Sequence, residues 1–212
     1  MARRIRTAPR KSPRQDRSLA TVDAILDATA RVLTTTGYDR ASTNRIAATA
    51  GVSVGSLYQY FPSKEALVAA LATRHNAKMT ALIRSKLAEF AQAPMHVAVR
   101  AMVDAMFEAH AVDPRLQRVL IEEVPRVGRL DNVRAVERET EALVAALLEA
   151  RKGELRRVGQ AGAPSQVETL AFVLVHVVQA VTHASVIAEH EPARARRVAD
   201  ELADLVLRYL VD

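Results

Sequence analysis

The chain has 212 residues, of which 50% are hydrophobic and 25% are charged, and it contains no cysteine. This length supports one or two globular domains with a substantial core. The lack of cysteine excludes disulfides and thiolate metal sites.

The net charge of +6 is concentrated near the start of the chain. Up to Lys64 there are 11 basic and 4 acidic residues, whereas the remainder has 19 basic and 20 acidic residues. A basic N-terminal segment on a neutral body is typical of a protein whose first part binds a polyanion. The alternative is a solvated basic surface without a partner.

Residues 1–16 are predicted to form a disordered basic arm, because they contain few apolar side chains that a core could bury. They include two prolines and six basic residues, namely Arg3, Arg4, Arg6, Arg10, Lys11 and Arg14. The arm lacks an apolar run, so we expect no secretory signal in it. It either enters a DNA minor groove through Arg3, Arg4 or Arg6 or acts as a non-specific tether. Both roles predict binding that weakens steeply with salt.

About nine helices and no strands are predicted for the rest of the chain, which indicates an all-α fold. Apolar residues recur at helical spacing, and most glycines and prolines fall between these periodic stretches. The helices are expected over residues 17–35, 43–50, 54–60, 64–90, 94–111, 114–124, 131–156, 165–189 and 192–210.

Local residues mark the ends of the first four helices. Gly37 and Gly51 are placed to end the first two, since glycine adopts the left-handed conformation that closes a helix. Ser42 or Thr43 is a good N-cap for the second helix, and Ser63 for the fourth.

The two short helices around Gly51 form a helix-turn-helix pattern. The small side chain of Ala47 lets the second helix approach the first, while Val52 and Leu57 face inward and fix the angle between them. The third helix is only about 10 Å long, so it can insert end-on into a major groove about 12 Å wide. Gly55 costs the helix about 1 kcal/mol relative to alanine, and a close approach to DNA would explain its presence.

Many positions between about Ser18 and Leu71, in fixed order, resemble the TetR/AcrR family of regulators. The matching residues are Gly37-Tyr38, Thr43-x-x-Ile46-Ala47, Ala50-Gly51-Val52-Ser53, Leu57-Tyr58-x-Tyr60-Phe61 and Lys64-x-x-Leu67. This resemblance covers a third of the chain. It implies a nine-helix, two-domain subunit that dimerises through its last two helices. It also implies that a ligand in the C-terminal domain weakens operator binding.

The resemblance further implies which residues contact DNA. Phosphate contacts are implied for Thr43, Tyr58, Tyr60 and Lys64. Contacts to bases or the adjacent backbone are implied for Asn44, Arg45, Ser53, Val54, Gly55 and Ser56.

Base specificity is poorly explained by these residues, because Val54 and Gly55 cannot make bidentate base contacts. We expect it to rest on Asn44, Arg45 and Gln59, with a thymine methyl group against Val54. Packing of the small domain is the alternative role for Tyr58, Tyr60 and Phe61, and for Phe61 packing is the expected role.

The helix predicted over residues 165–189 is apolar around nearly its whole circumference. It contains Glu168, His176, Gln179 and His183, which a bilayer would disfavour, so we expect a buried helix and no membrane partner. Such a helix must be covered on all sides, and we expect it to form a four-helix dimer seam with the last helix and their symmetry mates. The predicted interface residues are Val177, Ala180, Ala184, Ala188, Val198, Leu202, Leu205, Val206 and Tyr209.

An effector pocket is expected among the fourth to eighth helices. Candidate lining residues are Met102, Met106, Phe107, His110, Leu120, Glu122, His176 and Gln179. Methionine suits adaptable pockets, although a Met and Phe stripe also suits plain core. The scarcity of aromatic residues favours a small aliphatic or amphipathic ligand over a large planar one.

The face shared by His176, Gln179 and His183 has two interpretations. It is either a ligand or metal site or a set of polar groups satisfied across the dimer seam or beside a pocket. The second is favoured, so no metal and no cofactor are expected.

Together these features predict a cytoplasmic homodimeric regulator, most simply a repressor that leaves a palindromic operator when a small molecule binds. Its predicted domains are the arm at 1–16, the helix-turn-helix domain at 17–64, and the effector-binding and dimerisation domain at 65–212. An architectural DNA-binding protein without ligand control is the alternative. An enzyme is disfavoured, since no phosphate-binding loop, nucleophile motif or metal motif is found.

Overall fold

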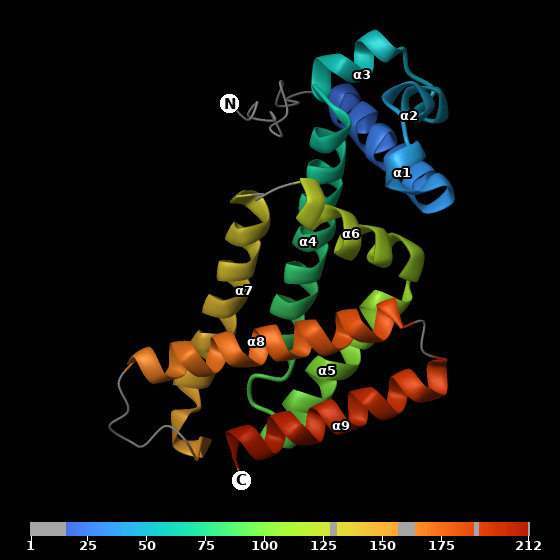
Figure 1. Cartoon of the computed structure of the whole chain (residues 1–212). Helices are drawn as coiled ribbons and strands as arrows, with labels where there is room; N and C mark the ends of the chain where they lie inside the picture. Colours follow the sequence, from blue (N-terminus) through green and yellow to red (C-terminus); the bar gives the residue numbers. More distant parts are fainter. Residues whose placement is uncertain (1–15, 128–130, 157–163, 189–190, 212) are drawn as a thin grey trace, which may run out of the picture. The chain divides into compact units, whose positions relative to one another are not determined.

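The computed structural model describes residues 16–127, 131–156, 164–188 and 191–211, so residues 1–15 of the predicted arm lie outside it (Figure 1). Within these ranges the chain is all-α, as predicted, and no strand occurs. The helices are α1 (Asp16–Arg40), α2 (Thr43–Ala50), α3 (Val54–Tyr60), α4 (Lys64–Glu89), α5 (Met95–Ala111), α6 (Pro114–Val127), α7 (Asp131–Ala150), α8 (Pro164–Ile187) and α9 (Pro192–Leu210).

Three predicted helix ends differ clearly from the structure, and the first is that of α1, which continues past the predicted end at residue 35 to Arg40. The seventh helix ends at Ala150, and Lys152–Glu154 forms a short 3-10 turn in place of a further helical turn. Gly153 lies in this turn, and glycine is unfavourable in a helix interior because of its entropy in the unfolded chain. The sixth helix continues to Val127, beyond its predicted end at residue 124.

The chain divides into two compact units, each with its own core. The first comprises Met1–Asn76 and Arg115–Val133, and the second comprises Ala77–Pro114 and Arg134–Asp212. Helix α4 therefore contributes to both units, and α6 belongs almost entirely to the first. The division into domains after Lys64 stays a prediction, while the compact first unit extends to Asn76.

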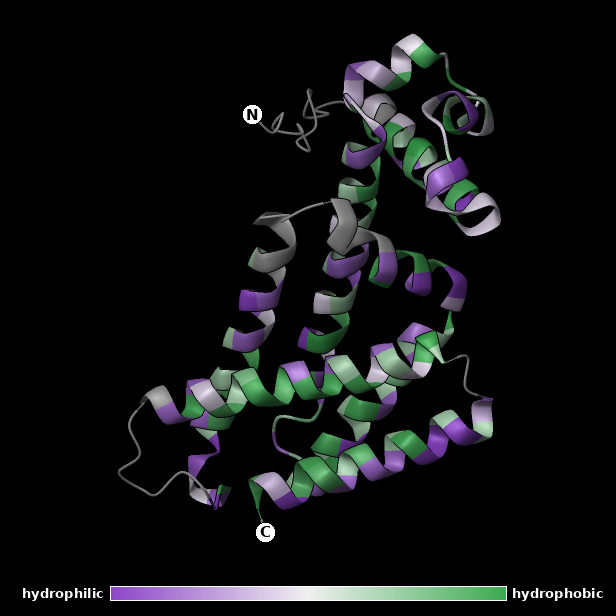
Figure 2. Ribbon diagram, in the orientation of Figure 1, coloured by the Kyte–Doolittle hydropathy of each residue, from purple (hydrophilic) through white to green (hydrophobic). Residues whose placement is uncertain are grey.

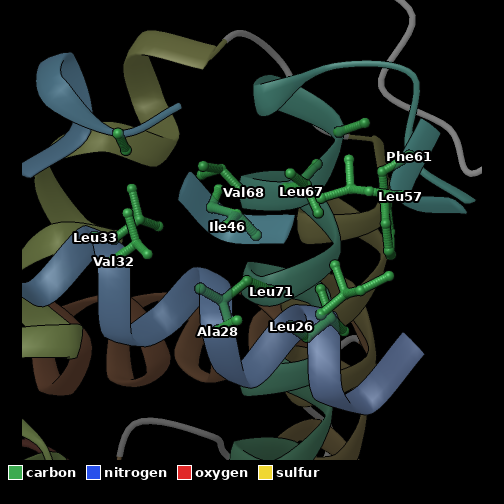
Figure 3. Close-up of a cluster of buried hydrophobic side chains, with 14 of the residues drawn as sticks. Leu26, Ala28, Val32, Leu33, Ile46, Leu57, Phe61, Leu67, Val68 and Leu71 are labelled. Carbon is green, nitrogen blue, oxygen red and sulfur yellow. The ribbon is translucent and has the colours of Figure 1, made fainter. Parts of the chain in front are cut away.

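The core of the first unit joins the apolar stripes of α1, α2, α3 and α4 (Figure 3). Ile46, Leu57 and Leu67 are completely buried there, and Phe61 is 1% exposed. Leu120 of α6 is also buried in this core. Burial of these side chains holds the two helices around Gly51 against the rest of the unit, because apolar burial stabilises packing by about 25 cal/mol per Å².

Two glycines turn the chain where the sequence predicts helix ends. At Gly37 the backbone breaks from helical geometry (φ 73°, ψ 167°), and one further turn leads to Arg40. At Gly51 it is left-handed (φ 69°, ψ 28°), and the Gly51 N–H closes α2 on the carbonyls of Ala47 and Ala48. A Cβ atom built at Gly51 would meet no atom within 4 Å. The backbone conformation alone therefore favours glycine at the turn of the helix-turn-helix.

The core of the second unit is built from α5, α7, α8 and α9. Val103, Ala171 and Ala203 are almost completely buried in it. On the surface of the same unit, Arg100 of α5 pairs with Asp200 at 2.7 Å and with Asp204 at 2.8 Å. These ion pairs fix α5 beside α9, although each one is partly exposed and contributes little free energy.

Helix α8 is apolar along most of its length (Figure 2). In the part of the chain that the structure describes, its segment Gln166–Ile187 is the one helix long and apolar enough to cross a membrane, and 28% of that apolar window is buried. One subunit therefore leaves much of this helix uncovered, and the expectation that a dimer partner completes its cover stays a prediction. Phe172 and Ile187 are 52% and 44% exposed, so α8 presents an apolar surface.

Candidate nucleic-acid interface

A side-chain hydrogen bond caps the N-terminal end of each of the two short helices in the helix-turn-helix. The Ser42 hydroxyl accepts from the Arg45 N–H at the start of α2 (3.3 Å), as predicted. At the start of α3 the Ser53 hydroxyl accepts from the Ser56 N–H (3.0 Å). It also donates to the Ser56 hydroxyl, 2.9 Å away. These caps satisfy N–H groups that a short helix leaves free, so α3 is well defined despite its seven residues.

One edge of α3 faces the core and the other is exposed. Leu57 is completely buried, whereas Val54 is 37% and Tyr58 is 40% exposed. Ser56 is half-buried. The other predicted base-contacting residues are all exposed, namely Asn44, Arg45, Ser53, Gly55 and Gln59. The exposed edge is thus rich in hydroxyl and amide groups, with Arg45 as a cation beside it.

Both tyrosines of α3 are held by hydroxyl partners on other helices. The Tyr58 hydroxyl lies 3.0 Å from Thr43 Oγ1 at the start of α2. The Tyr60 hydroxyl lies 3.2 Å from Ser18 Oγ of α1, and its half-buried ring packs against the core. Both hydroxyls are prepositioned, which lowers the entropy that a phosphate contact would cost. Phe61, in contrast, is core, as the packing interpretation predicts.

Lys64 is the predicted phosphate contact whose surroundings differ from expectation. Its Nζ donates to the Tyr38 carbonyl at 2.8 Å and lies 4.0 Å from the centroid of the Tyr38 ring. The Tyr38 hydroxyl in turn donates to Glu65 Oε1 at 3.3 Å. We call Tyr38, Lys64 and Glu65 the Tyr38 clasp. Tyr38 stands in the Gly37-Tyr38 motif, but nothing in that local pattern indicates its contact with Lys64.

Glu65 is kept ionised in this clasp. Partial burial alone would raise the pKa of its carboxyl group, but hydrogen bonds from its own N–H and from the Ser63 and Tyr38 hydroxyls, with the charge of Lys64, lower it below the ordinary value. A negative charge in the first turn of α4 is also favourable to the helix dipole.

The predicted effector residues do not gather within one unit. Met102 and Met106 of α5 are half-buried, Phe107 packs against the core of the second unit, and Leu120 belongs to the core of the first. Glu122 is exposed. The role of Leu120 as a pocket residue is thereby weakened, because its side chain is already used in packing. A surface hollow of about 370 Å³ is lined by other residues, namely Ala145, Ala146, Glu149, Val167 and Glu168.

The polar face of α8 meets two neighbouring helices. His176 Nε2 lies 3.2 Å from Glu141 Oε1 of α7, and its ring touches the edge of Phe172. The His183 ring lies 5.5 Å from the buried ring of His110 on α5. Among the described residues, no three His, Asp or Glu side chains lie close enough to hold a metal ion.

Burial of His110 predicts a pH dependence of stability. Its side chain is 3% exposed. Burial lowers the pKa of His110 below 6.5, and the bond from Nδ1–H to the Met106 carbonyl opposes this only in part. Below about pH 6.5 this histidine therefore binds a proton in the unfolded chain more readily than in the folded chain. The stability that depends on a neutral His110 is therefore fully present above this pH, and it is lost as the pH falls below it.

We expect the thermal unfolding midpoint of the wild type to fall between pH 7.5 and pH 5.5, and to fall less in a His110→Gln variant. Thermal unfolding followed by circular dichroism at both pH values measures this. The exposed His96→Gln variant is the matched control and should keep the wild-type difference. An unchanged difference in His110→Gln would contradict the assignment.

The predicted dimer residues divide into three groups. Ala180, Ala184, Ala188 and Leu205 are exposed, whereas Val177, Val198 and Tyr209 are half-buried. Leu202 and Val206 are 4% and 5% exposed in the core of their own unit. Their side chains pack in that core because the apolar stripe of α9 turns toward α5, and their place in a dimer interface stays a prediction.

Two family models match the chain. Residues 25–71 match "Bacterial regulatory proteins, tetR family", and residues 94–210 match "Tetracyclin repressor-like, C-terminal domain". A nucleoid occlusion factor, SlmA of Haemophilus ducreyi, is 38% identical over 85 residues, which are 40% of this chain and 41% of SlmA. The chain thus matches about two fifths of that relative.

Solved structures show the same fold over nearly the whole chain. The fatty acid degradation regulator FadR from Bacillus halodurans is 22% identical, with a TM-score of 0.70 over 93% of this chain and 96% of FadR. FadR from Bacillus subtilis, solved with stearoyl-CoA, is 17% identical, with a TM-score of 0.69 over 88% of this chain and 98% of that protein. With the second family model covering more than half of its residues, the chain belongs to the TetR family of DNA-binding transcription regulators.

Proposed function

We propose that this protein is a cytoplasmic repressor that binds a palindromic operator as a homodimer and releases it when a small molecule occupies the C-terminal unit. The observation that carries DNA binding is the exposed edge of α3, where Tyr58 is 40% exposed and is held 3.0 Å from Thr43 at the start of α2. The hydroxyl groups of Thr43 and Tyr58 lie beside α3, a helix that fits the major groove, and they are proposed to bind adjacent phosphates.

The exposed surface of α8 supports the dimer. Ala180, Ala184 and Ala188 lie one helical turn apart and are all exposed. Small residues at this spacing let a second helix approach closely, and the neighbouring Phe172 supplies apolar area. A two-fold dimer built on this surface would present two α3 helices to half-sites about 34 Å apart.

Ligand control is proposed from the family and from the neutral body of the chain. The scarcity of aromatic residues favours a small aliphatic or amphipathic effector, and the stearoyl-CoA bound to Bacillus subtilis FadR is an amphipathic example in this fold. Helix α4 has residues in both units, so it is the proposed route by which the effector changes operator affinity. A coupling of about 1–3 kcal/mol is the usual scale.

Tyr58→Phe is expected to weaken DNA binding by about ten-fold, because a hydrogen bond to a charged group contributes about 1.5–3 kcal/mol. The probe is a duplex selected by the wild-type protein from a random 30-bp library, and affinity is measured by fluorescence anisotropy. Ser85→Ala also removes one hydroxyl group, from an exposed position of α4 outside the helix-turn-helix, and should leave affinity unchanged. Equal affinity of Tyr58→Phe and wild type would refute the proposed contact.

A second function is favoured by one comparison. The partial similarity to SlmA, a nucleoid occlusion factor, supports an architectural DNA-binding protein without ligand control. Footprinting on genomic fragments separates the two, since a repressor protects one palindrome and an architectural protein coats long stretches. Release of the selected duplex by a fatty acyl-CoA probe would favour the repressor further.

A further inference from the structure

In the Tyr38 clasp, the charged ammonium group of Lys64 contacts groups of the protein itself. Its Nζ is within hydrogen-bonding distance of one acceptor, the Tyr38 carbonyl at 2.8 Å, and lies over the Tyr38 ring at 4.0 Å. The lysine side chain is half-buried. A cation held by a carbonyl and an aromatic face is already stabilised within the protein.

The position of Lys64 in its own helix indicates the same role. It is the first residue of α4, where a positive charge is unfavourable to the helix dipole. Its ammonium group instead binds the Tyr38 carbonyl, in the single turn between the backbone break at Gly37 and Arg40. The lysine thus ties the start of α4 to this turn.

The clasp is connected to the DNA-facing surface through the corner between α1 and α2. The Tyr38 carbonyl that binds Lys64 also accepts from the Ala41 N–H, 3.2 Å away. Ala41 is buried, and the next two residues are the cap of α2 and Thr43, whose hydroxyl holds Tyr58. Release of Tyr38 would therefore loosen the start of α2 and the rim of α3.

We propose that Lys64 is a positioning residue for DNA binding, which fixes the corner between α1 and α2 through Tyr38, and that it does not pair with a phosphate. This inference rests on the proposed DNA-binding surface of α2 and α3. It assigns the affinity effect of Lys64 to the geometry of Thr43 and Tyr58.

Salt dependence separates the two roles. An ion pair with phosphate adds about 0.9 to the slope of log affinity against log salt concentration. We expect Lys64→Met to weaken binding of the selected 30-bp duplex by about ten-fold, as loss of a charged hydrogen bond would, with an unchanged slope. Arg45→Met is the comparison, because Arg45 is an exposed cation beside α3, and loss of a cation that lies free to approach the DNA should lower the slope. A similar loss of slope in Lys64→Met would overturn the proposal.

Hydrogen exchange tests the clasp without DNA. In Lys64→Met, amides of residues 41–46 should exchange faster, while those of α9 keep their wild-type rates. A lysine that served only a phosphate would leave these amides unchanged, and that result would overturn the proposal even if affinity fell. Failure of the wild type to bind any duplex would count against the proposed function alone, since the exchange result would still stand.

Two further variants keep the test decisive if Lys64→Met disturbs folding. Lys64→Gln removes the charge but keeps an N–H donor for the Tyr38 carbonyl, so it should retain more affinity than Lys64→Met. Tyr38→Leu removes the ring, and the double variant with Lys64→Met should bind no more weakly than Lys64→Met alone. Additive losses in the double variant would show that Lys64 acts independently of Tyr38.

Discussion

Replacement of Phe61 by alanine is expected to lower the free energy of unfolding of the first unit by about 3–5 kcal/mol and to abolish DNA binding. Phe61 is 1% exposed and follows α3 as its C-terminal cap. Its ring fills the core beside Leu57 (Figure 3). A cavity there removes packing from the core that holds both short helices, because Phe61 is the largest of the fully buried side chains.

Hydrogen exchange on peptides of α1, α3 and α9 measures this effect. In Phe61→Ala the protection of α1 and α3 should fall, while α9, whose core is separate, keeps its rates. Phe61→Leu leaves most of the volume and should cost about 1 kcal/mol. Wild-type protection of α3 in Phe61→Ala would show that the ring is not part of the stabilising core.

Ala184→Arg should convert the proposed dimer into monomers and lower operator affinity by at least about two orders of magnitude, since half of the DNA contacts would bind alone. Ala184 is exposed on the apolar surface of α8 between Ala180 and Ala188. An arginine there needs space that a closely packed helix lacks, and its charge would be buried without a partner. Its exposure in the single subunit means that the substitution should leave the fold intact.

Light scattering coupled to size exclusion gives the oligomeric state, and circular dichroism confirms helix content. Ala146→Arg makes the same change at another exposed alanine, on α7, and should remain dimeric. A dimeric Ala184→Arg protein with wild-type affinity would exclude this part of α8 from the interface.

The helix-turn-helix could be predicted almost to the residue because its determinants are local. Ser42 caps α2 on an amide three residues later, and Gly51 closes it on Ala47 and Ala48. The Ser63 hydroxyl likewise accepts from the Ala66 N–H at the start of α4, at 3.2 Å. Each of these interactions spans one helical turn, so the sequence pattern contains it.

Long-range partners could not be predicted in the same way. Helical spacing shows that Leu202, Leu205 and Val206 share a region of α9, but it does not show which element covers them. The structure buries Leu202 and Val206 in their own core and leaves Leu205 56% exposed. Lys64 is similar, because its partner Tyr38 is 26 residues away. A basic residue in a basic segment predicts an anionic partner, and nothing local indicates a tyrosine ring and carbonyl instead.

At the turn formed by Gly51, the handedness of the backbone restricts which amino acids fit, whereas the space for a side chain does not. Its backbone has a positive φ of 69°, yet a Cβ at this position would project into open space. A mirror-image amino acid prefers this backbone region. D-alanine, introduced by chemical synthesis of the first unit, would restrict the unfolded chain more than glycine does. The folded conformation of the turn between the two DNA-facing helices would then be favoured over the unfolded chain.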